Sequence, residues 1–362
     1  MFNKLINTHK IKYSVLDTLV KELPYDTDFI TIYIDFDSIM RKFFRKDLVD
    51  VFEAFNSYEK LMFSSEVINI GVHYRHYFWS RYKIKTDVYF LFNSIKDTNI
   101  TDINKEFNLK KYDRDPMYNI IEKTMKRNFK LINVIKDYLP QMYFIDGRGI
   151  ETFILPYVLM EKLVPMKNHL NLILSTDKLM YQYTSEPNTS VLKLQYDRSY
   201  VVNSDNVIGH LFKDEKSNFI HPSYSKFILA MSGCNTCDLK NVKGLGVGKT
   251  RKILDDISIH NNIDLGKKIS PKMFKSFLKE EKIMTEERIK QFNNNLKCIN
   301  AKKWYKTLSE SQKNIITTQI SDKLDNNGIM GINEEYYPDN PIQLLEIWEG
   351  CTEDGKPRSI QL

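Results

Sequence analysis

A glycine-rich loop that leads into a basic helix is the most specific chemical signal in the chain. Its residues are Gly244, Gly246, Gly248, Lys249, Thr250, Arg251 and Lys252. Closely spaced glycines before a helix let backbone N–H groups approach an anion, and the positive end of the helix dipole favours negative charge there. The segment therefore predicts a contact with phosphate, most simply the backbone of a nucleic acid.

Two other sites are compatible with parts of this segment. The run GLGVGKT resembles a nucleotide-binding P-loop, but Lys243 stands where the first glycine belongs and no apolar strand precedes it. Cys234 and Cys237 form a C-x-x-C pair, whereas zinc needs a second pair. Cys298 and Cys351 are single residues in dissimilar contexts. We expect two buried thiols in a turn, and a zinc site stays the open alternative.

A second group of polar side chains follows short apolar runs in the first half of the chain. The runs are Phe29–Asp35, Asp87–Phe92, Met142–Ile145 and Leu170–Leu174. Each reads as a buried strand. Asp35, Asn93, Asp146 and Asp177 fall at the strand ends, where a parallel sheet places its ligand site.

The elements that must position these groups alternate between strand and helix. The helix-length segments are Ser38–Phe55, Met117–Tyr138 and Glu151–Leu163. This alternation predicts the α/β class, with a mainly parallel twisted sheet covered by helices on both faces. Beyond Asp205 the segments are mostly helical, over His221–Met231, Gly248–Ile257, Pro271–Lys282, Glu286–Leu296 and Ala301–Ile320. We expect an α/β domain over 1–205, a helical region over 206–325 and an acidic arm over 326–362.

Charge is distributed unevenly along the chain. The formal net charge is +7, yet Lys240–Lys306 alone carries 17 Lys or Arg against 7 Asp or Glu. The segment Ser321–Leu362 carries 3 basic and 9 acidic residues. Basic residues gathered in one segment favour a phosphate backbone, because neutralising phosphates releases counterions. A solvated, lysine-rich surface is the plainer interpretation.

The composition narrows the class of protein. No run of 18 apolar residues is present, so we expect no membrane span, and the polar start does not suit a signal peptide. Four cysteines in 362 residues do not make a disulfide framework. We therefore expect a cytoplasmic protein. The abundance of Lys, Asn and Ile suggests an AT-rich phage or viral genome, which would place it inside the host cell.

Four segments, in order, resemble the flap endonucleases and 5′→3′ exonucleases, which have a PIN-like nuclease fold. Ser232–Leu254 resembles their helix–three-turn–helix, a helix-hairpin-helix element. Ile32–Met40 is similar to their first strand, which ends in a metal-binding Asp, here Asp35. Ile145–Leu155 takes the place of their GxEADD motif and Ile173–Tyr183 that of SxDxDxxQL. The resemblance implies DNA as the partner and Mg²⁺ or Mn²⁺ as the cofactor of an active member.

The metal ligands that the resemblance implies are mostly replaced. Asp35, Glu151 and Asp177 match, but the second strand ends in Asn93 where the family has Asp. The other acidic positions hold Phe153, Ile154, Leu179, Cys234 and Cys237. Too little negative charge remains for two Mg²⁺ ions, which prefer oxygen ligands. Asp37 and Asp146 lie nearby and can compensate for one ligand at most.

The matching acids have three interpretations. Asp35, Glu151 and Asp177 can be structural or vestigial, as caps and turn residues. They can hold a single ion without efficient cleavage, or they can support real nuclease activity. We expect no cofactor under the first interpretation and Mg²⁺ or Mn²⁺ under the last.

Two further segments have a functional and a structural interpretation. Lys110, Lys111 and Arg114 fall where the family has a basic arch over single-stranded DNA, and a solvated loop is the alternative. The segment 73–79 interleaves aromatic and basic side chains that could stack on bases. Because it precedes a buried strand at helical spacing, we expect a packed helix face.

The sequence leads to one principal hypothesis and two alternatives. The principal one is a catalytically impaired 5′-nuclease-like protein, a pseudoenzyme that binds DNA as a subunit or adaptor in a phage or viral nucleic-acid complex. An active Mg²⁺-dependent 5′→3′ exonuclease or flap endonuclease is the first alternative, and a protein–protein scaffold without DNA binding is the second. The acidic arm, with Leu344, Leu345, Ile347 and Trp348, is either a docking element for a protein partner or packed on its own domain.

Overall fold

A computed structural model describes most of the chain. It covers residues 17, 19–21, 27–36, 38, 57–93, 142–162, 169–193, 200–234 and 239–323. Several predicted features lie outside these residues: Asp37, Cys237, the helix Met117–Tyr138, most of the helix Ser38–Phe55, the arch residues Lys110, Lys111 and Arg114, and the acidic arm 326–362.

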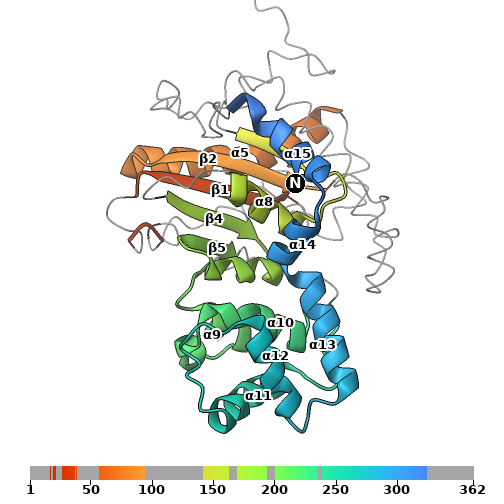
Figure 1. Ribbon diagram of the computed structural model, residues 1–362. Helices are drawn as coiled ribbons and strands as arrows, with labels where there is room; N and C mark the ends of the chain where they lie inside the picture. The colour runs from red at the N-terminus through yellow and green to blue at the C-terminus, as the bar shows by residue number, and fades with distance from the viewer. Residues whose placement is uncertain are drawn as a thin grey trace, which may run out of the picture.

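The described part contains a six-stranded sheet in the order β3-β2-β1-β4-β5-β6 (Figure 1). Its strands are β1 (Phe29–Asp35), β2 (Lys85–Phe92), β3 (Met142–Asp146), β4 (His169–Ser175), β5 (Thr189–Lys193) and β6 (Tyr200–Val202). The first five are parallel, and β6 runs antiparallel to β5. The four predicted strands and the mainly parallel sheet are confirmed, whereas β5 and β6 were not predicted.

The sheet is covered closely enough to bury β1, one of its two central strands, completely. Every residue of β1 is buried, as expected for a strand covered on both faces. The helix α5 (Ser57–Tyr82) packs on β2. At Gly71 a side chain would come within 3.0 Å of Phe90, Met142 and Val88, so this glycine sets the close approach of helix and sheet.

The segment 73–79 lies on α5, and its side chains pack as a helix face. Tyr74, Tyr77 and Phe78 are buried, and so is Arg75. The Tyr77 ring meets Phe78 edge-on, with 5.3 Å between ring centroids. The structure thus places these aromatic side chains in the core rather than on a surface that could stack on bases.

The described residues after 205, up to residue 323, are mostly helical, as predicted. The elements are α9 (Val207–Phe212), α10 (Ser225–Ser232), α11 (Val247–His260), α12 (Pro271–Glu280), α13 (Glu286–Ile299), α14 (Ala301–Thr307) and α15 (Glu310–Thr317), with short 3₁₀ turns among them. The segment Ala301–Ile320, predicted to be mostly helical, consists of α14, α15 and the start of the 3₁₀ segment η6 (Thr318–Lys323). Ser309 and Gln312 form a capping box, in which each side chain bonds the other residue's backbone, and this starts α15 as a separate helix.

Two other predicted helices begin in a tighter turn. Glu151–Leu163 is a 3₁₀ turn, η1 (Thr152–Ile154), followed by α8 (Leu155–Lys162). His221–Met231 is likewise divided into η4 (Pro222–Tyr224) and α10. The 3₁₀ segment η2 (Lys178–Ser185), which follows β4, was not predicted.

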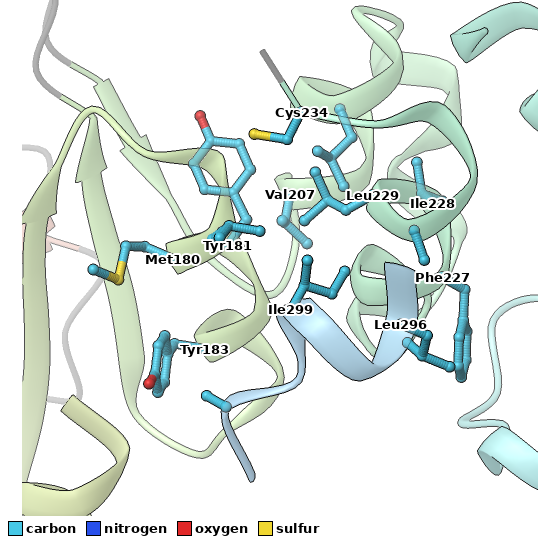
Figure 2. Close-up of a cluster of buried hydrophobic side chains, with 14 of the residues drawn as sticks. Met180, Tyr181, Tyr183, Val207, Phe227, Ile228, Leu229, Cys234, Leu296 and Ile299 are labelled. Carbon is cyan, nitrogen blue, oxygen red and sulfur yellow. The ribbon is translucent and has the colours of Figure 1, made fainter. Parts of the chain in front are cut away.

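One continuous apolar core joins the sheet to the helices (Figure 2). Met180, Tyr181 and Tyr183 on η2 belong to the same buried cluster as Leu229 on α10 and Ile299 on α13. Figure 1 shows α9 to α13 beyond the β5 edge of the sheet, and α10 packs on η2. No helix among the described residues is long and apolar enough to cross a membrane.

Candidate functional site: the carboxyl edge of the sheet and the helical hairpin

The strand order defines where a ligand crevice belongs. The chain runs outward from β1 through β2 to β3, and then crosses to β4 on the other side of β1. In open parallel sheets, ligands bind at the carboxyl ends of the two strands between which the order reverses. Here these strands are β1, which ends at Asp35, and β4, which ends at Ser175.

Asp35 is buried at this point, and serine hydroxyls contact its carboxylate. The side chain is 5% exposed. Its Oδ2 accepts a hydrogen bond of 2.6 Å from Ser175 Oγ and a shorter one from Ser38 Oγ. Its Oδ1 accepts from the Ser38 backbone N–H at 3.3 Å. Both carboxylate oxygens thus have protein donors, which satisfies a buried charge.

Asp177 is joined to Asp35 through Ser175. The Ser175 hydroxyl oxygen accepts from the Asp177 N–H at 2.9 Å while it donates to Asp35. Asp177 caps η2, because its Oδ1 accepts from the Leu179 N–H at 2.9 Å. The Cys234 thiol lies 3.9 Å from the same oxygen. Asp177 therefore caps the 3₁₀ segment η2, whereas the structural role expected for it was that of a turn residue.

A buried lysine that the sequence did not point to lies beside these acids. Lys193 ends β5 and pairs in register with Ser175. Its ammonium donates to the Thr176 carbonyl at 2.6 Å and lies 5.5 Å from the centre of the Tyr181 ring. Burial lowers the pKa of Lys193, and the charge of Lys178 lowers it further, whereas Asp177 and Cys234 oppose the shift. The sequence did not indicate this lysine because it ends β5, a strand of only five residues that was not predicted.

The polar groups after β2 and β3 hold the turn that follows β3. Asn93 Oδ1 accepts from the Gly149 N–H at 2.7 Å, and Asp146 Oδ1 accepts from the Arg148 N–H at 2.9 Å. The side chain of Gln319 bonds both the N–H and the carbonyl of Asp146, at 2.9 and 3.0 Å. Gln319 thus anchors the end of the helical region to the sheet edge.

Glu151, the third acid that the resemblance implied, lies just before η1. It is half-buried, and its carbonyl accepts from the Ile154 N–H at 2.8 Å. Ile154 and Leu179, which stand where the family has acids, are buried apolar side chains. Among the described residues, no three His, Cys, Asp or Glu side chains come together as a group that could hold a metal ion.

The second part of the site is the hairpin between α10 and α11. Cys234 and Leu239 pair through two backbone hydrogen bonds of 2.9 and 3.0 Å, and the Val242 N–H donates to the Met231 carbonyl at 2.9 Å. Gly233 and Gly244 have φ of +75° and +78°, a conformation that favours glycine. The turn 235–238, with Cys237, lies outside the described residues. Cys234 and Cys298 are buried.

One face of α13 fixes the backbone of the hairpin. Arg288 Nε donates to the Lys243 carbonyl at 3.0 Å, and Gln291 Oε1 accepts from the Lys243 N–H at 2.9 Å. Gln291 Nε2 donates to the Asn241 carbonyl at 2.9 Å. Asn295 Nδ2 donates to the carbonyls of Ala230 and Lys240 at 2.8 and 2.9 Å. Within the loop itself, Asn241 Nδ2 donates to the Leu245 carbonyl at 2.9 Å, so side chains of α13 and of the loop together hold its backbone.

The start of α11 is open. Gly246 is the N-cap, and no side chain caps the helix. A Cβ added at Gly246 or Gly248 would meet nothing within 4 Å, and both residues are exposed, as are Lys249 and Lys252. The first N–H groups of a helix have no intrahelical partner, so they are available to a ligand.

Two residues predicted at this surface have contacts inside the protein. Thr250 is fully buried, and its hydroxyl has no partner among the described residues. Arg251 Nε bonds both carboxylate oxygens of Asp255 at 3.1 Å, and its guanidinium lies over the rings of Phe212 and Phe219 at 5.6 and 5.5 Å. The roles predicted for both in DNA binding stay predictions.

No known protein family and no curated protein matches the sequence. Among solved structures, the chain is similar to a bacteriophage T5 flap endonuclease in a pseudo-enzyme–product complex with DNA and metal ions, at 12% identity and a TM-score of 0.46, over 81% of this chain and 97% of that one. It is similar to the T5 5′-exonuclease bound to zinc ions, at 14% identity and a TM-score of 0.45, over 81% and 98%. It is also similar to the catalytic core of Rad2 in complex with a DNA substrate, at 12% identity and a TM-score of 0.32, over 83% of this chain and 75% of that one. These proteins are of the class that the motifs resemble.

Proposed function

We propose that the protein binds DNA through the hairpin and the start of α11 and does not cleave it efficiently. The observation that carries this proposal is the N-terminus of α11, which no side chain caps. Gly246 and Gly248 leave open space around it, and Lys249 and Lys252 lie in the first turns of the same helix. A phosphate can reach its N–H groups without displacing any described side chain. Arg288 and Gln291 of α13 hold the backbone of the hairpin in place before DNA binds. Because the loop is already ordered, the entropy cost of binding is lower.

The sheet edge supports the second half of the proposal. Metal-assisted phosphodiester cleavage needs carboxylates free to coordinate cations. Asp35 is instead bonded to two serines, Asp177 caps η2, and Leu179 offers a buried apolar side chain in place of a further acid. On this basis the protein is a catalytically impaired 5′-nuclease-like subunit or adaptor in a phage or viral nucleic-acid complex, with 1–205 as its α/β domain and 206–325 as its DNA-binding region.

The glycines of the loop provide the sharpest test of DNA binding. Gly246→Ala and Gly248→Ala place a methyl group where the protein has open space, so folding should be unchanged or, at Gly248, slightly favoured. We expect either variant to weaken binding of a labelled duplex in fluorescence anisotropy, because the methyl group stands between the ligand and the N–H groups. Unchanged affinity in both variants would remove the hairpin from the interface.

Charge at the same surface is tested with a matched pair of variants. Lys249→Gln/Lys252→Gln should reduce affinity and make its dependence on salt shallower, by up to about 0.9 for each phosphate that is no longer neutralised. Lys213→Gln/Lys216→Gln removes the same charge from exposed positions after α9 and should change both much less. Affinity that is absent or independent of salt in the unmodified protein would favour the scaffold alternative.

Cleavage is tested with labelled flap and nicked substrates in Mg²⁺ or Mn²⁺. The unmodified protein and Asp177→Ala should give the same low background, because the site lacks the carboxylates to position two cations. Cleavage that disappears in Asp177→Ala would contradict the impaired state and support the active exonuclease or flap endonuclease alternative.

A further inference from the structure

The helix α12 is fixed to the body by aromatic side chains on one face. Phe274 stacks on Phe227 of α10, with 4.3 Å between ring centroids, and lies 6.0 Å from Phe292 of α13. Leu278, one turn further on, is also fully buried. Because this face is held in the core, the remaining faces of α12 have a defined orientation.

Lysines recur along α12 at the spacing of one helical stripe. Lys272, Lys275 and Lys279 are separated by three and four residues, so they lie above one another on the same side of the helix. Lys272 and Lys279 are exposed, and Lys275 is partly exposed. At 1.5 Å per residue the stripe is about 10 Å long.

Two lysines from neighbouring helices extend this stripe. Burial lowers the pKa of Lys275, and the charges of Lys303 on α14 and Lys297 in the last turn of α13 lower it further. Helix α12 also packs directly on α13, which carries Lys297 in its last turn. We call the five residues the lysine patch: Lys272, Lys275, Lys279, Lys297 and Lys303.

The positive charge of the lysine patch is not neutralised by its described surroundings. None of the five lysines forms an ion pair with a carboxylate in the part of the chain that the structure describes. The described ion pairs in this region are Lys267 with Asp264 at 3.8 Å and His260 with Glu281 at 3.2 Å. Like charges crowded together destabilise a fold unless an anion lies among them, so the patch favours a polyanionic partner.

The side chains around the patch favour a double-stranded nucleic acid. Binding of single strands uses aromatic side chains on which bases stack. The exposed aromatic residues among those described are Tyr82 and Phe219, neither of which lies on α12, α13 or α14. The aromatic side chains beside the patch, Phe277, Trp304 and Tyr305, are partly buried against the core. The ammonium groups of the patch suit the dense phosphate charge of a duplex.

We propose that the lysine patch is a second DNA-contacting surface, which holds the phosphate backbone of a duplex and is separate from the hairpin. The inference rests on the proposed function, since both surfaces are expected to bind the same DNA. Helix α13 joins them: Arg288 near its start holds the hairpin, and Lys297, nine residues or about 14 Å further along, belongs to the patch. Nine residues are about two and a half helical turns, so Lys297 projects from the side of α13 opposite Arg288, and the two surfaces lie on different sides of this helix.

The test is a salt titration of duplex affinity by fluorescence anisotropy. In Lys272→Gln/Lys279→Gln/Lys303→Gln all three replaced side chains are exposed, so the fold should be retained. We expect weaker binding and a slope of log K against log salt that is shallower by up to about 2.7, or 0.9 for each of three phosphates that the variant cannot neutralise. Lys21→Gln/Lys213→Gln/Lys216→Gln removes the same charge elsewhere and should leave the slope nearly unchanged. Urea unfolding of each variant confirms that the fold is intact.

The outcomes separate this inference from the proposed function. If the hairpin variants weaken binding and the patch variant behaves like its control, the patch is no contact surface and the proposed function stands. If the patch variant weakens binding and the hairpin variants do not, the inference stands and the hairpin loses its role. If the unmodified protein binds no duplex, both are overturned.

Discussion

The hydroxyl of Ser175 donates a 2.6 Å hydrogen bond to the carboxylate of Asp35, across the boundary between β4 and β1. The two residues are 140 positions apart in the chain. Their contact occurs where the strand order reverses, which is the expected position of a ligand in such a sheet. Asp35, the acid at the end of the first strand, thus accepts hydrogen bonds from two serines of the same chain.

Ser175→Ala should therefore destabilise the fold. The substitution removes a donor from a buried carboxylate and leaves the Asp177 N–H without its acceptor. We expect the free energy of unfolding in urea to fall by about 1–3 kcal/mol, the cost of a buried group left without a partner. Ser276→Ala, at an exposed position on α12, is the matched control and should change it by less than about 0.5 kcal/mol. Equal stability of the two variants would show that the Asp35 contact contributes nothing.

The ends of the first four strands could be predicted from the sequence, but their connections could not. Continuous apolar runs identified β1 to β4, and the parallel arrangement placed Asp35 and Asp177 at one edge. The sequence TSVLK of β5 is too short and mixed to stand out, so Lys193 and its contact with Thr176 were missed. The partners of Ser175 are set by strand order, which local patterns do not encode.

The helical half was predicted in outline, and two of its finer features differ in how far the sequence indicates them. The break between α14 and α15 could have been read from Ser309 and Gln312, whose spacing is that of a capping box. The bonds from α13 to the hairpin could not be predicted from the sequence. Arg288, Gln291 and Asn295 bond to backbone atoms rather than to distinctive side chains. Every residue type has a backbone carbonyl, so the type of the accepting residue does not indicate such a bond.

His169 should make stability depend on pH. Burial lowers its pKa from 6.5 to about 4, and its Nε2 lies 2.7 Å from the Thr31 hydroxyl. Between these values the unfolded chain binds a proton that the folded protein does not, so stability is lost as the pH falls from 6.5 towards 4. Between pH 7 and pH 5 the loss from this residue should be about 2 kcal/mol.

The measurement compares urea unfolding of the unmodified protein and His169→Gln at both pH values. The variant cannot titrate in this range, so it should lose less stability than the unmodified protein on acidification. Subtracting the two profiles removes the contributions of other groups, including His210, whose pKa is also lowered by burial and by Lys193. Parallel profiles would show that His169 does not titrate differently in the two states.

Gln291→Ala should weaken DNA binding without changing any charge. Gln291 bonds the Lys243 N–H and the Asn241 carbonyl, so its removal frees the hairpin backbone on both sides of Val242. A loop that must be ordered on binding adds an entropy cost, and we expect lower affinity with the same slope against salt. Gln312→Ala at the start of α15 removes a glutamine with no contact to the hairpin and serves as the control. A shallower slope in Gln291→Ala would instead mean that the variant neutralises fewer phosphates.

Arg251 and Lys252 are neighbours on α11 whose replacement should have opposite consequences. Arg251 bonds Asp255 and Ser217 and lies over two aromatic rings, whereas Lys252 is exposed. Arg251→Ala should lower the free energy of unfolding by about 1–3 kcal/mol, because it removes a part-buried, charged set of hydrogen bonds. Lys252→Ala should leave stability within about 0.5 kcal/mol and weaken only DNA binding. The reverse pattern, a stable Arg251→Ala with a steep drop in affinity, would return Arg251 to the set of phosphate-binding residues and show that its bonds to Asp255 and its packing on the two rings are dispensable.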